Sequence, residues 1–122
     1  MPQAVLLQEF GSHVWAVFGH PPYHVGSSLM EKTWRDVDVR LILPDAEYAA
    51  LELGDGKPST EICNAKWVAL CLAFSALGKS LTGLPIDFQI QQQTHADKAY
   101  QGNRAALCLH PLRLKQEKEK RT

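Results

Sequence analysis

The sequence has few cysteines, no net charge and no long apolar run, and each of these shortages excludes a class of protein. Three cysteines occur in 122 residues, with no C-x-x-C pair, so neither a disulfide framework nor a structural zinc site is expected. The 13 basic and 13 acidic side chains cancel, so no protein-wide field attracts nucleic acid. The longest apolar run, WVALCLAF, is far shorter than the ~20 residues that cross a bilayer.

The two ends of the sequence also carry expectations. The opening MPQAVLLQEF has no basic leader and no small-residue cleavage site, so no secretory signal is predicted and a cytoplasmic location is expected. The 45% hydrophobic content supports a packed core, which we assign to a single domain over residues 1–112. Residues 113–122, RLKQEKEKRT, are predicted to be a charged, disordered tail.

Apolar periodicity and turn residues predict seven elements. A short strand or the end of a helix falls at 14–18, a strand begins at 23, and residues 36–43 alternate as a half-buried strand. A short helix follows over 45–53, then a loop over 54–60. The second half of the chain predicts a long helix from 60 to about 80, a strand over 86–91 and a last short helix near 94–100.

The long predicted helix is apolar on every side, which indicates a central place in the core. Its apolar residues recur at steps of four and three, and they include Cys63, Trp67, Leu70, Phe74 and Leu77. This order of elements predicts a small α/β or α+β domain, with a mixed sheet and helices packed mainly on one face. The opposite face of the sheet would then expose its polar residues.

Three aspartates fall on the polar side of the two best predicted strands. Asp36 and Asp38 project to one side about 6–7 Å apart, and Asp87 holds the equivalent phase of the strand over 86–91. If the strands are neighbours, the three carboxylates converge and could hold Mg²⁺ or Mn²⁺, which prefer oxygen ligands. The alternatives are an ordinary solvent-facing strand and a structural salt bridge between Asp87 and Arg40.

A glycine turn precedes the first two aspartates. Gly26 allows close approach of the backbone to a phosphate, and the hydroxyls of Ser27 and Ser28 are suitable donors to its oxygens. A simple turn without a ligand is the alternative interpretation of these residues.

Three pieces of the sequence follow one another over residues 23–91, namely HVGSSL, WRDVDVRLIL and LPIDFQI. In this order they resemble the DNA polymerase β-like nucleotidyltransferase superfamily. The resemblance implies a nucleotidyltransferase-like core in which Asp36, Asp38 and Asp87 bind divalent ions. It also implies that Asp87 acts as general base or orients the acceptor hydroxyl. The Gly26–Ser28 turn would hold the phosphates of a nucleoside triphosphate such as ATP.

The sequence also departs from that family. The basic and glycine residues expected after the turn are replaced by SLMEKTW, where Lys32 or Arg35 is a substitute source of positive charge. Within these residues no helical domain for binding the acceptor is present. The sequence therefore does not specify whether the acceptor is a protein, an RNA or a small molecule. The second hypothesis is a catalytically weak or inactive nucleotide-binding or interaction module on the same fold, a partner subunit or antitoxin-like regulator. For either hypothesis, a homodimer or a complex with a partner protein is expected of so small a domain.

Overall fold

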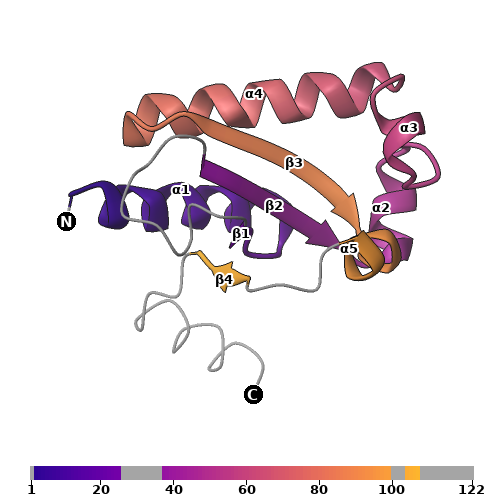
Figure 1. Ribbon diagram of the computed structural model, residues 1–122, viewed down its shortest axis with the longest axis horizontal. Helices are drawn as coiled ribbons and strands as arrows, with labels where there is room; N and C mark the ends of the chain where they lie inside the picture. The colour runs from indigo at the N-terminus through magenta and orange to yellow at the C-terminus, as the bar shows by residue number, and fades with distance from the viewer. Residues whose placement is uncertain (1, 26–36, 100–103, 108–122) are drawn as a thin grey trace.

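The computed structural model describes residues 2–25, 37–99 and 104–107, and these form a mixed α+β fold (Figure 1). Its elements in chain order are α1 (Pro2–Phe18), β1 (Tyr23–Val25), β2 (Val37–Leu43), α2 (Asp45–Ala50), α3 (Pro58–Glu61), α4 (Ala65–Thr82), β3 (Ile86–Gln92), α5 (Gln93–Ala99) and β4 (Ala105–Ala106). The predicted fold class, a mixed sheet with helices mainly on one face, is confirmed.

The described strands form one four-stranded sheet in the order β3-β2-β1-β4. β1 runs antiparallel to both of its neighbours, whereas β2 and β3 are parallel. A parallel pair cannot be joined by a hairpin, and the chain between β2 and β3 forms α2, α3 and α4. Residues far apart in the sequence therefore come side by side at the β2–β3 boundary.

The core lies between one face of the sheet and the two long helices. Successive strand residues point to opposite faces, and the buried set takes alternate positions of β2 and β3. This core cluster includes Val37, Val39, Leu41, Leu43, Ile86, Phe88 and Ile90 from the strands, Leu7, Phe10 and Val14 from α1, and Trp67 and Cys71 from α4. The polar residues of both strands are thereby left on the other face.

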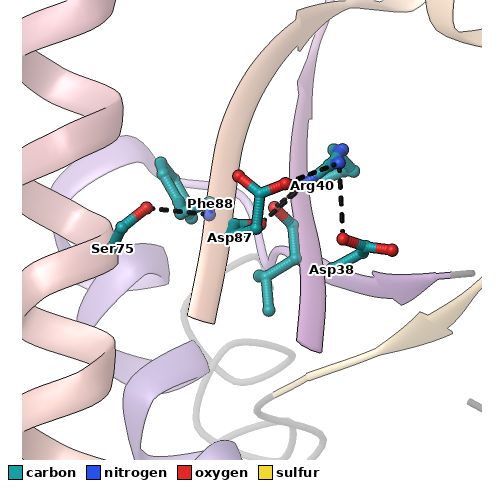
Figure 2. A network of polar contacts seen from close by, with 6 residues as sticks. Asp38, Arg40, Ser75, Asp87 and Phe88 are labelled. Carbon is teal, nitrogen blue, oxygen red and sulfur yellow. Dashed lines mark hydrogen bonds and ion pairs between the residues drawn. The ribbon is translucent and has the colours of Figure 1, made fainter. Parts of the chain in front are cut away.

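Helix α4 also covers the outer edge of β3. The Ser75 hydroxyl accepts a hydrogen bond from the Phe88 amide at 2.9 Å, as Figure 2 shows. The Trp67 indole donates to the Ile90 carbonyl at 2.8 Å. Both bonds satisfy backbone groups that an edge strand otherwise leaves open, so β3 is protected against pairing with another chain.

The long helix begins later than its periodicity predicts. The Asn64 side chain caps it by accepting from the Trp67 amide at 2.9 Å, and Gly83 ends it with φ +73°. Residues Pro58–Glu61 form the separate helix α3 inside the region predicted as a loop and helix start. Cys63 falls in the turn between them and is exposed, so its predicted place in the core is wrong.

The N-terminal half also differs from the prediction in two places. Residues 14–18 are the end of a helix, as one of the two alternatives held, but that helix starts at Pro2 and covers the core. The helix predicted over 45–53 ends at Ala50, and Glu52 then takes φ +59° while Leu53 is fully buried. Strand β4 was not predicted, because two residues carry no periodicity.

Gly78 marks a close approach of α4 to the sheet. A Cβ built there would lie 2.9 Å from Cγ1 of Ile86, which is inside van der Waals contact. We expect Gly78→Ala to lower the free energy of unfolding by about 1–2 kcal/mol, because overpacking outweighs the gain in helix propensity. Urea titration measures this change. Ser80→Ala, on the exposed side of α4, is the control, and equal stability of both variants would contradict the prediction.

Candidate functional site

Two of the three predicted aspartates lie directly opposite each other. In the parallel β2–β3 pairing, Asp38 is the register partner of Asp87. Both belong to the polar face of the sheet, and their side chains are 33% and 50% exposed. The register therefore places the predicted pair side by side on one face of the sheet, and Figure 2 shows both carboxylates beside Arg40.

The remaining predicted site residues, Gly26, Ser27, Ser28 and Asp36, lie outside the described residues. Among the residues that the structure describes, no group of three or more His, Cys, Asp or Glu side chains is placed to hold a metal ion. The described part of the candidate site therefore consists of the Asp38–Asp87 pair and its immediate neighbours.

The nearest neighbour of the pair is Arg40, which follows Asp38 on the same face of β2. Its Nη2 lies 3.4 Å from Oδ2 of Asp87 and 3.7 Å from Oδ1 of Asp38 (Figure 2). Its Nη1 also donates to the Asp87 carbonyl at 2.7 Å. The salt bridge that the sequence left open as an alternative for Asp87 is therefore present. The guanidinium offsets the repulsion between the two carboxylates, as a bound cation would.

His24 lies near this site on β1, the other neighbour of β2, but its side chain is on the core face of the sheet. Its backbone is the register partner of Val39, and its side chain is only 4% exposed. Burial lowers the pKa of His24, and the negative charge of Asp38 opposes this effect in part. The imidazole is therefore neutral at pH 7 and adds no positive charge beside the carboxylates.

A second polar cluster, which the sequence did not reveal, lies beyond the carboxyl ends of β2 and β3. The Tyr48 hydroxyl, on α2, donates to Oε2 of Glu61 at 2.6 Å in the interior. Glu61 and His95 line a small cavity of about 30 Å³ beside this bond. Nearby, the Asp45 carboxylate accepts from the Thr94 amide at 3.1 Å and joins α2 to α5. These contacts fix the helices around the strand ends.

Glu61 gives this cluster a pH dependence. Burial raises its pKa above the ordinary 4.5, and the Tyr48 hydrogen bond opposes only part of that effect. The stabilisation that protonated Glu61 provides is therefore fully present below pH 4.5, and it is lost as pH rises through the raised pKa. Glu61→Gln should remove this loss, as unfolding titrations from pH 4 to 8 measure.

The comparison of wild type with Glu61→Gln isolates the carboxyl group. Because burial lowers the pKa of His24, protonation of His24 destabilises the fold as pH falls, but this effect is the same in both proteins. Asp45 and Asp55 have pKa values held below 3.8 by hydrogen bonds from Thr94 and Thr60, and therefore titrate below this range. Parallel stability curves for the two proteins would contradict the assignment.

A third feature is an apolar hollow of about 250 Å³ between the end of α1, β2 and α2. It is lined by Val17, Phe18, Leu43, Glu47, Ala50 and Leu51. Its charged lining residue, Glu47, contacts Nε2 of His20 at 2.6 Å. A triphosphate needs cations and donors, so this hollow does not suit one, and the polar face of the sheet remains the candidate site.

Comparisons with known proteins found no match: no protein-family model, no curated protein and no solved structure matches this chain. Within the described residues, none of the helices combines the length and apolar character needed to cross a membrane.

Proposed function

We propose that the protein is a metal-dependent nucleotidyltransferase, which moves a nucleoside monophosphate from a nucleoside triphosphate to a hydroxyl acceptor. The observation that supports this proposal is the register of β2 and β3, which sets Asp38 opposite Asp87 on the exposed polar face. Adjacent strands lie about 4.8 Å apart, so two facing carboxylates can share one divalent ion.

The residues present fit such an ion. Arg40 already places a positive charge between the two carboxylates, at 3.4 and 3.7 Å from their oxygens. In the loaded protein, Asp38 and Asp87, joined by Asp36, would hold Mg²⁺ or Mn²⁺ in its place. The ion supplies charge neutralisation for the phosphates. Gly26, Ser27 and Ser28 would bind the triphosphate by backbone and hydroxyl donors.

In this proposal Asp87 also acts as general base or orients the acceptor hydroxyl, because it is the more exposed carboxylate of the pair. The acceptor hydroxyl oxygen forms a bond to the α-phosphorus, and the bond from that phosphorus to the bridging oxygen breaks. Pyrophosphate leaves with the electron pair, and Asp87 accepts the hydroxyl proton or orients the hydroxyl. Positioning and electrostatics supply most of the acceleration in such a transfer.

Thermal melts with metal and nucleotide test this proposal. Mn²⁺ with a non-hydrolysable ATP analogue should raise the melting midpoint more than either ligand alone, because ligands that bind the folded state stabilise it. Release of pyrophosphate from each of the four ribonucleoside triphosphates, with protein, RNA and small-molecule acceptors, then measures turnover. No midpoint change with any metal and nucleotide would overturn the proposal.

Arg40 favours a second candidate function, a catalytically inactive nucleotide-binding or interaction module. Its guanidinium contacts both carboxylates, so the same three residues are also a complete surface ion-pair network. Such a module would bind a triphosphate without releasing pyrophosphate. The turnover measurement therefore separates the enzyme from the module, whereas the melt alone does not.

Arg40→Gln tests whether the guanidinium and a metal ion compete for the same carboxylates. We expect the variant to bind Mn²⁺ roughly threefold to tenfold more tightly, because exposed ion pairs contribute up to about 1 kcal/mol each. Titration calorimetry with Mn²⁺ alone measures this. Arg104→Gln is the matched control, since Arg104 pairs with Asp97 at 3.1 Å and is similarly covered. An unchanged affinity in Arg40→Gln would place the ion elsewhere.

A further inference from the structure

Helix α4 has an apolar surface on its solvent side, which we call the outer face of α4. Its exposed residues are Ala65, Lys66, Ala69, Leu72, Ala73, Ala76, Leu77, Lys79 and Ser80. Leu72 is 65% exposed and Leu77 38% exposed. The buried side of the same helix carries Trp67, Cys71, Gly78 and Thr82 against the sheet. Apolar side chains therefore occupy the side of α4 that normally carries polar residues.

No described element covers this face. In Figure 1, α4 runs along the upper border of the molecule, with β3 on its inner side. Apolar groups that gather on an exposed helix typically mark a protein interface. Alanine at positions 69, 73 and 76 also lets a second helix approach closely, since interhelical distances depend on side-chain size at the contact.

The charges on the outer face indicate what kind of helix would bind. Lys66 and Lys79 stand at its two ends, and α4 contains no aspartate or glutamate. At 1.5 Å per residue, these two lysines are about 20 Å apart along the axis. Within the described part of the chain, neither ammonium group forms a salt bridge. We infer that the outer face of α4 binds a partner helix with acidic residues at both ends and small apolar residues between them.

A second copy of α4 fits this face less well. If two such helices packed antiparallel about Leu72, Lys66 of each copy would lie near Lys79 of the other. A parallel arrangement would bring each lysine near its own equivalent. Like charges meet in both arrangements, which costs affinity and disfavours self-association.

A membrane surface also fits this face less well. Helices that lie in a bilayer interface insert large residues such as Trp, Phe and Leu. Here Trp67 is on the core side, Phe74 packs against the core, and the outer face offers only two leucines. Small side chains with terminal lysines suit a flat helix contact better than insertion into lipid.

This interface is independent of the proposed transferase site. Asp38 and Asp87 lie on the polar face of the sheet, whereas the outer face of α4 points away from β3. Substitutions on one of these surfaces should therefore leave ligand binding at the other surface unchanged. Loss of peptide binding would say nothing against nucleotide binding, and the reverse also holds.

Two designed peptides test the inference on the full chain. The acidic peptide is a fluorescein-labelled helix with an Ala/Leu stripe between two glutamates 13 positions apart, and the basic peptide has lysines instead. Fluorescence anisotropy should show binding of the acidic peptide. Its Kd should rise at least ~10-fold in Leu72→Asp and in the double variant Lys66→Glu/Lys79→Glu. The double variant should prefer the basic peptide, because charge reversal exchanges the specificity.

Lys98→Glu, on exposed α5, is the control and should bind the acidic peptide like the wild type. Circular dichroism checks that each variant is folded. Equal binding of both peptides, or no binding of either, would overturn the inference. Sedimentation showing a dimer that Leu72→Asp dissociates would replace the partner with a second copy. Leu72-dependent binding to phosphatidylserine vesicles would replace it with a membrane.

Discussion

Asp87→Asn is expected to lower the rate of pyrophosphate release by about 10²–10³-fold, since preorganised charges of this kind commonly contribute that much to turnover. The substitution keeps the shape of the side chain but removes its charge and its basicity. Mn²⁺ binding should weaken as well, because the ion would lose one of two facing carboxylates. The free energy of unfolding should change by less than about 1 kcal/mol, since the Arg40 pair is exposed.

Asp97→Asn is the matched control for this prediction. Asp97 is 56% exposed and pairs with Arg104 at 3.1 Å, much as Asp87 is 50% exposed and pairs with Arg40 at 3.4 Å. Unlike Asp87, Asp97 lies on α5 and is not the register partner of Asp38. If both variants release pyrophosphate equally well, the carboxylate pair has no part in catalysis.

Phe88→Ala is expected to lower the free energy of unfolding by about 3–5 kcal/mol, as truncation of a buried aromatic ring usually does. Phe88 is 1% exposed and lies beside Asp87 on the core face of β3. Its ring lies 5.3 Å from that of Phe74 on α4 and 6.0 Å from that of Phe10 on α1. The substitution thus removes a ring that contacts both long helices.

Urea denaturation measures this loss, with Ile62→Ala as the control. Ile62 is 69% exposed, so its truncation should change stability by less than about 0.5 kcal/mol. A cost for Phe88→Ala below about 1 kcal/mol would mean that the core repacks around the vacated space.

The two longest strands, β2 and β3, could be predicted because apolar and polar residues alternate along their sequences. Except for Ile42 and Gln92, residues 37–43 and 86–92 place apolar side chains on one face and polar ones on the other, and the fold retains this pattern. The same alternation assigned Asp38 and Asp87 to one face. Their direct opposition also depends on the strand register, which the tertiary structure determines.

Other features depend on contacts that no local pattern carries. The Tyr48–Glu61 hydrogen bond joins two short helices across a turn, and neither residue belongs to a recognisable motif. Cys63 follows the apolar spacing of α4, but capping by Asn64 starts the helix after it. In α1, Leu7, Phe10 and Val14 recur with helical spacing, although Gly11 and the β-branched residues favour helix only weakly.

The parallel pairing of β2 with β3 also has a consequence for the order of biosynthesis. Arg40 and Asp87 are 47 residues apart, so their ion pair is a contact of high sequence separation. Contacts of this kind form late, because the intervening loop must close first. A nascent chain that has not yet emerged past residue 87 therefore carries Asp38 and Arg40 without their partner. The carboxylate pair comes into existence only when the last long strand docks.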